Sequence, residues 1–130
     1  MSDNRESLYP KDWLGKAKKD LHRVRLLLAD GDTEGAGFHL QQAIEKYLKG
    51  YLLSKGWKLE YVHSLVKLLN YAKDCDPSFE EFRTLCGQVT GYYIVDRYPF
   101  PVDASPTKEE IEQAFRKTED LVNKIDAEVK

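Results

Sequence analysis

The chain has 130 residues, of which 42% are hydrophobic and 32% charged, and its formal net charge is −2. This composition is typical of one soluble globular domain with a core of its own, and it excludes a disordered tail. The net charge argues against bulk electrostatic capture of nucleic acid, although a local basic patch is compatible with it.

The sequence favours a cytoplasmic, reduced protein without metal or cofactor. No apolar run approaches the roughly 18–20 residues that span a bilayer, and the polar N-terminus lacks the apolar core of a signal peptide. Cys75 and Cys86 do not have C-x-x-C spacing. The three histidines, His22, His39 and His63, lie on different segments without the spacing of a helical metal site.

The first predicted helix follows a polar tail, residues 1–9, and opens a single domain over residues 10–130. Asp12 is the predicted N-cap, and Gly31 follows the C-terminus. Apolar residues at steps of three and four share one face: Trp13, Leu14, Ala17, Leu21, Val24 and Leu28. The opposite face is predicted to be solvated and carries Lys16, Lys18, Lys19, Arg23 and Arg25.

The second predicted helix runs over residues 33–54 and has an apolar stripe wide enough for more than one neighbour. His39 lies between Phe38 and Leu40, where a hydrogen-bonded histidine near the core is the favoured interpretation. A shorter third helix is predicted around residues 62–72, with Ser64 as its cap.

The fourth predicted helix starts at Asp76-Pro77, because proline suits the first turn, and its apolar repeat continues into TGYYIVDRYPFPVD, residues 90–103. Gly87 and Gly91 lie on one face and are predicted to let a neighbouring helix approach closely.

The last predicted helix follows a proline-rich loop, residues 98–106, and Thr107 and Glu110 have the spacing of a capping box. Helical periodicity throughout predicts an all-α fold, an antiparallel bundle of four to five helices. The predicted core includes Leu21, Leu40, Ile44, Leu48, Val89, Phe115 and Leu121.

The candidate site is the tyrosine-rich end of the fourth helix. Arg97 presents a fork of donors that matches phosphate or carboxylate, and Tyr92, Tyr93 and Tyr98 could add stacking faces. This chemistry suits a nucleotide or single-stranded nucleic acid. The alternative is that Arg97 caps the last carbonyls of its helix or pairs with a carboxylate while the tyrosines pack. Standard phosphate-binding loops and nucleophile elbows are absent from the sequence.

The order of four segments resembles the HEPN domain family over roughly residues 10–128: DWLGKAKKDLHRVRLLL, GFHLQQAIEKYLKGYLLSKG, HSLVKLL and YYIVDRYPFP. The resemblance implies an HEPN-like helical bundle that usually dimerises, and many members of the family are encoded beside a minimal nucleotidyltransferase. Other members are RNA-cutting toxins, in which an arginine is followed four to six residues later by a histidine.

In this chain Arg97 occupies the arginine position, but residues 98–106 contain no histidine. The resemblance is therefore to an arginine-tyrosine-proline branch, and the missing acid–base partner argues against an enzyme. It implies a non-catalytic nucleotide- or RNA-binding module of prokaryotic type, a homodimer, and a partner of a nucleotidyltransferase in a toxin–antitoxin system. The implied ligand residues are Arg97, Tyr98, Tyr93, Tyr92, His63, Lys46 and Lys49.

Two alternatives stay open. One is a metal-independent ribonuclease toxin that combines Arg97 with a histidine from elsewhere, such as His39 or His63. The other is a protein-interaction subunit without a ligand.

Overall fold

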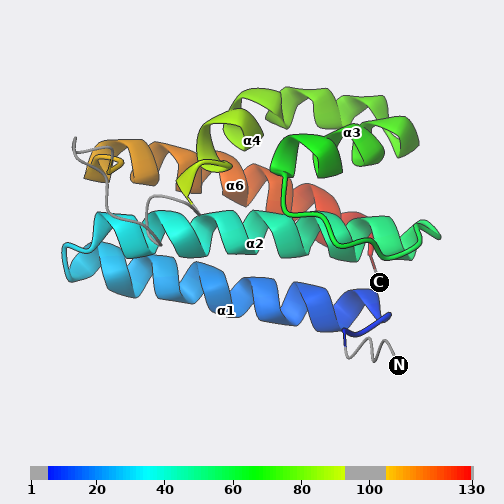
Figure 1. Ribbon diagram of the computed structural model, residues 1–130, viewed down its shortest axis with the longest axis horizontal. Coiled ribbons are helices and arrows are strands. Elements are labelled where there is room, and N and C mark those ends of the chain that lie inside the picture. The colour runs from blue at the N-terminus through cyan, green and yellow to red at the C-terminus, as the bar shows by residue number, and fades with distance from the viewer. Residues whose placement is uncertain (1–5, 93–104, 130) are drawn as a thin grey trace.

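The computed structural model describes residues 6–92 and 105–129. Within these ranges the chain forms five α-helices, one 3-10 helix and no β-strand, so the predicted all-α fold is confirmed (Figure 1). The long helices α1, α2 and α6 lie roughly alongside one another, and the shorter α3 and α4 lie on the far side of α2 from α1.

Helix α1 spans Pro10–Ala29, and its N-cap lies about one turn before the predicted N-cap, Asp12. Tyr9 is the N-cap, because Pro10 lacks the N–H that the first turn would leave unpaired anyway. The prediction that Asp12 caps α1 was therefore wrong. Its carboxylate instead accepts the Ser7 hydroxyl at 2.6 Å, which holds the preceding segment against the first turn.

Helix α2 spans Thr33–Ser54, the predicted bounds, and the Asp32 carboxylate accepts from the Gly35 backbone N–H at 2.8 Å. The short connection from α1 turns at Gly31, whose φ of +83° suits glycine. Helix α3 covers Leu65–Cys75, and the Ser64 cap is confirmed.

The predicted fourth helix is interrupted in the structure. It starts as a 3-10 helix, Pro77–Phe82, continues as α4, Arg83–Val89, and then gives way to a turn at residues 90–91. The prediction of one continuous helix was wrong because the low helix propensity of Gly91 acts together with a tertiary contact. The Thr90 hydroxyl accepts the backbone N–H of Leu65 at 3.4 Å, which draws this turn toward the start of α3.

Helix α6, Lys108–Glu128, begins with the predicted capping box. The Glu110 backbone N–H donates to Thr107 Oγ1 at 3.1 Å, and the Thr107 N–H donates to Glu110 Oε1 at 3.1 Å. Two orphan donors of the first turn are thereby satisfied.

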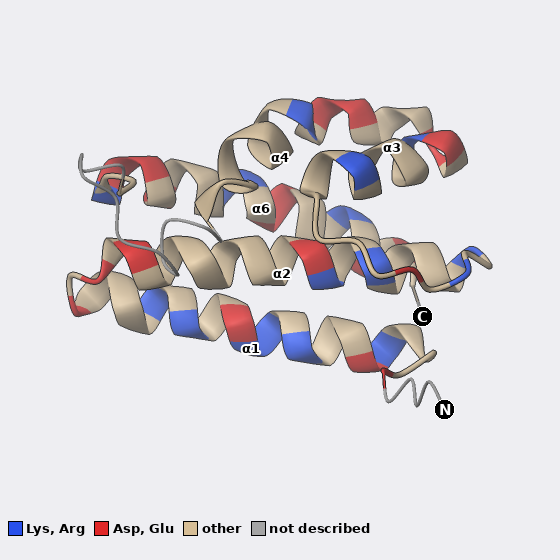
Figure 2. Cartoon of the chain, in the orientation of Figure 1, with Lys and Arg blue, Asp and Glu red and all other residues tan. Residues whose placement is uncertain are grey.

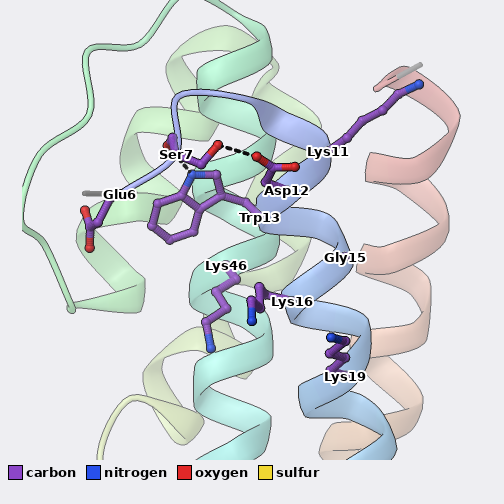
Figure 3. Close-up of a pocket in the computed structure, with 9 residues that line it drawn as sticks. All are labelled: Glu6, Ser7, Lys11, Asp12, Trp13, Gly15, Lys16, Lys19 and Lys46. Atoms are coloured by element: carbon purple, nitrogen blue, oxygen red, sulfur yellow. Dashed lines mark hydrogen bonds between the residues drawn. The ribbon is translucent and has the colours of Figure 1, made fainter. Parts of the chain in front are cut away.

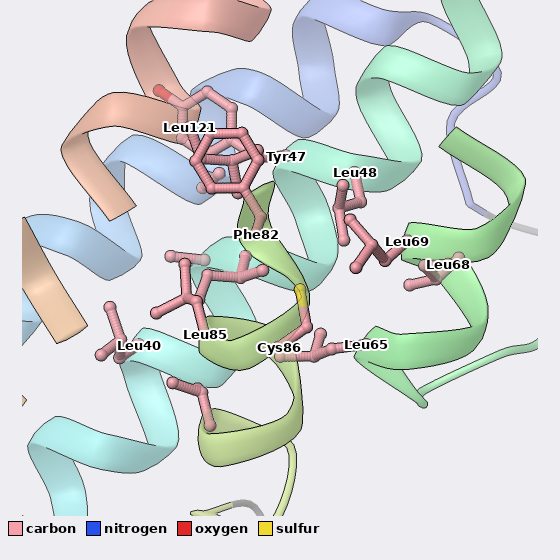
Figure 4. Close-up of a cluster of buried hydrophobic side chains, with 14 of the residues drawn as sticks. Leu40, Tyr47, Leu48, Leu65, Leu68, Leu69, Phe82, Leu85, Cys86 and Leu121 are labelled. Carbon is pink, nitrogen blue, oxygen red and sulfur yellow. The ribbon is translucent and has the colours of Figure 1, made fainter. Parts of the chain in front are cut away.

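The core lies where α2 meets α1, α3, α4 and α6, and Figure 4 shows the part that faces α3, α4 and α6. Six of the seven predicted core residues are buried: Leu21, Leu40, Ile44, Leu48, Val89 and Leu121. Phe115 is the exception, because it lies only partly buried at the edge of the core, with the Arg25 guanidinium 4.8 Å from its ring centre.

Close helix approaches occur at other glycines than the sequence predicted. In the described parts of the chain, a Cβ added at Gly87 or Gly91 would meet nothing within 4 Å, so the predicted approach is absent there. A Cβ at Gly50 would lie 2.8 Å from Leu14 Cδ2 and 3.1 Å from the Pro10 carbonyl oxygen, so α1 packs closely on α2 at this glycine.

The helices do not have the character of membrane spans. Over residues 6–92 and 105–129, each helix is too short or too polar to cross a bilayer.

Candidate functional site

Three of the seven predicted ligand residues, Tyr93, Arg97 and Tyr98, lie outside the described residues. Their roles remain predictions. The other four can be placed, and they fall into three environments around α2.

Tyr92 is a packing residue near the start of the candidate stretch, residues 90–103, that contains Arg97. Its side chain is only 8% exposed, and a Cβ added at Gly37 of α2 would lie 3.1 Å from the ring. The Tyr92 hydroxyl accepts from Gln88 Nε2 at 3.2 Å, and burial raises the pKa of Tyr92. The chain that leads to Arg97 is therefore anchored on α2, while the ligand role of Tyr92 remains a prediction.

Lys49 and His63 meet at a buried carboxylate, that of Glu45. Lys49 Nζ donates to Glu45 Oε2 at 3.0 Å, and His63 Nδ1 lies 3.2 Å from the same oxygen. Gln41 Nε2 donates to Glu45 Oε1 at 3.1 Å. Lys49 is only 2% exposed, and its ammonium also lies 5.4 Å from the centre of the Trp13 ring. This geometry holds Lys49 inside the protein, away from solvent.

Lys46 belongs to a second buried cluster, centred on Asp20 of α1, which is 2% exposed. The Asp20 carboxylate accepts from Lys46 Nζ and from Arg23 Nη1, the latter at 3.2 Å. His39 Nδ1 lies 2.9 Å from Asp20 Oδ1, which confirms a hydrogen-bonded histidine near the core. Asp20 thus ties α1 to two positions on α2.

The two clusters share one chemical consequence. An ionised carboxylate can only accept, so the Nδ1 atoms of His39 and His63 donate, and Nε2 is the basic atom of each neutral ring. A carboxylate that fixes an imidazole in this way also fixes its orientation. Side-chain exposure differs between the two rings, at 25% for His39 and 50% for His63. His63 is therefore better placed to meet a solute.

Sequence reasoning missed the two organising carboxylates, Asp20 and Glu45. Asp20 lies seven residues after Trp13 and three after Ala17, which places it on the apolar face of α1. A carboxylate at such a position requires a buried partner, and this was the available signal. Within the described ranges no three His, Cys, Asp or Glu side chains lie close enough together to hold a metal ion.

Comparison with known protein families identifies the family of the chain. The HEPN domain family model matches residues 10–128, nearly the whole chain. The chain belongs to the HEPN domain family. This confirms the resemblance on which the candidate site was predicted.

Two solved structures are similar to this chain in fold. TT1696 from Thermus thermophilus is 31% identical, with a TM-score of 0.77 over 91% of this chain and 96% of that chain. ST0689, described as an archaeal HEPN homologue, is 24% identical, with a TM-score of 0.74 over 94% of this chain and 98% of that chain, and it supports the fold. No curated protein matches the chain.

Proposed function

We propose that this HEPN domain is a non-catalytic module that binds a nucleotide or RNA through Arg97. The observation that carries the proposal is the sequence Arg97-Tyr98-Pro99 in a chain of this family, without a histidine in residues 98–106. Arginine supplies paired donors to phosphate, whereas the acid–base partner that RNA cleavage requires is missing.

The described residues support different roles for the candidate residues around Arg97. Lys49 and Lys46 are paired with the carboxylates of Glu45 and Asp20, so they contribute to the packing of α2. Tyr92 anchors the start of the segment on α2. The aromatic and guanidinium groups that follow Tyr92 in the sequence, Tyr93, Arg97 and Tyr98, then supply the ligand contacts, and His63 is a further candidate.

The binding proposal is tested by titrating the wild type and Arg97→Lys with ATP and a short RNA in a calorimeter. Lysine keeps the charge but loses the planar fork, so affinity should fall about tenfold or more while the melting temperature stays unchanged. Equal affinities for the two proteins, or an Arg97→Lys protein that unfolds, would assign Arg97 to a structural role.

Assembly as a homodimer is part of the same proposal, since HEPN domains commonly form dimers. Gly87 supports it, because this helical glycine is exposed and its open face leaves room for a second copy. Light scattering should give twice the 15.0 kDa chain mass. A single-chain mass at micromolar concentration would contradict it.

A cytoplasmic partnership with a minimal nucleotidyltransferase in a toxin–antitoxin system follows from the family resemblance and is proposed on that basis alone.

A ribonuclease is the second candidate function, and the Glu45-oriented, half-exposed His63 is the observation that favours it. His63 Nε2 would act as the proton acceptor beside Arg97. Cleavage of a fluorogenic RNA in the presence of a metal chelator should then be lost in His63→Ala. A wild type that leaves this RNA intact would exclude the candidate.

A further inference from the structure

A groove of about 680 Å³ runs along the first half of α1, next to the middle of α2 (Figure 3). Trp13, Gly15, Lys16 and Lys19 line it from α1, and Lys46 lines it from α2. In Figure 3 the lysines 16, 19 and 46 lie on one side of the Trp13 ring, whereas Lys11 points away from them.

Lys16 and Lys19 differ in their pairing from Lys18 and Arg25 on the same helix. Lys18 pairs with Asp126 at 3.9 Å, and Arg25 pairs with Glu119 at 3.9 Å, so the flank of α1 that faces α6 is compensated. In the parts of the chain that the structure describes, Lys16 and Lys19 have no such carboxylate. Positive charge is thus concentrated beside the groove in a chain of net charge −2 (Figure 2).

Lys46 adds a third, positioned charge to the groove. One of its three N–H groups goes to the buried Asp20, which fixes the ammonium at the groove wall. The remaining donors of Lys46 can serve a ligand without breaking the Asp20 pair. The carboxylates that line the groove, Glu6 and Asp12, lie at its N-terminal end, and Asp12 already accepts the Ser7 hydroxyl.

Gly15 gives an independent sign that the groove is kept open. Glycine has the lowest helix propensity after proline, yet Gly15 lies inside α1. A Cβ at this position would meet nothing within 4 Å in the described residues, so packing there does not demand glycine. The neighbouring wall is rigid, because Trp13 Nε1 donates to the Ser7 carbonyl at 2.7 Å.

We propose that this groove is a second anion site, which binds the phosphate groups of a nucleotide or of single-stranded RNA. Lys16, Lys19 and Lys46 supply the donors, and the missing side chain at Gly15 leaves room for the ligand. The inference makes no use of Arg97, so this site and the Arg97 site can fail separately.

The test uses Trp13 as its reporter. The chain has two tryptophans, so a Trp57→Phe background leaves Trp13 as the only one. Titrations with ATP, inorganic tripolyphosphate and a short oligouridylate should each be followed by Trp13 fluorescence. Competition between tripolyphosphate and ATP would assign the nucleotide as the phosphate source. Binding of the oligouridylate alone, weakening as salt rises, would assign the RNA backbone.

Matched variants separate a site from general charge. In this background, Lys16→Ala combined with Lys19→Ala should weaken binding about tenfold or more. Lys18→Ala changes the same helix by one charge on the compensated flank, and it should change affinity less than about twofold. Gly15→Leu should fill the groove and weaken binding. Both Gly15→Leu and Gly15→Ala should raise the melting temperature, because leucine and alanine have a higher helix propensity than glycine.

Three results would overturn the inference. The first is that none of the three probes changes the Trp13 fluorescence. The second is that Lys18→Ala loses as much affinity per removed charge as the double variant does. The third is that the double variant and Gly15→Leu both bind the probes as tightly as the background protein. If Arg97→Lys abolishes all binding while the lysine double variant retains it, the Arg97 proposal stands and the groove does not.

Discussion

The two sides of α2 differ in the polar groups that they bury. Toward α3, α4 and α6 it presents fully buried apolar side chains, among them Leu40, Ile44 and Leu48 (Figure 4). Toward α1 it also packs on buried apolar residues, Leu14, Ala17 and Leu21. On this side and at the segment around His63, however, its polar residues meet the buried carboxylates of Asp20 and Glu45. One helix therefore carries a purely apolar side and a side on which buried ion pairs, those of Asp20 and Glu45, form a polar seam within the core.

The apolar contacts and the buried ion pairs of α2 have different effects: the first stabilise the fold, and the second fix the positions of polar side chains. Apolar burial contributes about 25 cal/mol for each Å² removed from water, whereas the desolvation of a buried ion pair offsets most of its Coulombic gain. The apolar contacts of α2 therefore supply most of the folding free energy. The seam supplies defined positions for Lys46, His39 and His63, at a high cost if one partner is removed.

The core should show the largest effect of a single substitution. Phe82 is fully buried and packs 6.2 Å, centre to centre, from Phe79. Phe82→Ala should lower the free energy of unfolding by about 3–5 kcal/mol in urea denaturation. Phe115→Ala is the control, because this ring is only partly buried, and its loss should be clearly smaller. Equal losses would show that the edge of the bundle is as well packed as its centre.

The seam should respond next, and in a different pattern. Glu45→Leu leaves the ammonium of Lys49 buried without its partner, which should cost about 3 kcal/mol. Lys49→Met added to Glu45→Leu should recover most of that loss, because no buried charge then remains unpaired. A double-mutant cycle by urea denaturation measures the coupling. Additive losses would contradict the contrast between the two sides of α2, since the pair would then behave like independent core residues.

Sequence periodicity predicted the core side much better than the seam. Repeats of three and four residues locate the apolar stripes of α2, and the Thr107–Glu110 box depends on local spacing alone. The seam depends on tertiary pairing, because Asp20 meets His39 and Lys46 across the α1–α2 interface, 19 and 26 residues away along the chain. Local spacing carries no information about such partners.

The candidate site divides in the same way. Arg97 was predicted from its residue type and its neighbours in the chain, while the carboxylates that orient His63 and Lys46 were missed. The groove beside Gly15 was missed for a related reason. Its lysines read as a solvated face, and only the structure shows which of them have a carboxylate partner and which do not.

The smallest expected effect lies on the surface, at the cap between α3 and the 3-10 helix. Hydrogen bonds from Ser78, at 2.8 Å from its hydroxyl and 3.0 Å from its N–H, lower the pKa of Asp76 to about 2, and Lys124 at 3.1 Å adds to this. The folded-state pKa is below the unfolded value of 3.8. The stabilisation by Asp76 is therefore fully present above about pH 4 and is lost as the pH falls toward 2.

Asp76→Asn should accordingly melt below the wild type at pH 5, and the gap should close as the pH falls to 2. Ser78→Ala removes the largest cause of the shift, so it should reproduce the trend with a smaller gap. Glu80, whose pKa the Arg83 guanidinium helps to lower to about 2, remains in both variants, and both should keep part of the acid sensitivity of the wild type. Thermal melts followed by circular dichroism from pH 5 to 2 measure these gaps. A difference in melting temperature that stays constant over this range would mean that Asp76 acts through geometry alone. A difference as large as that caused by Glu45→Leu would remove the distinction between exposed and buried carboxylates in this fold.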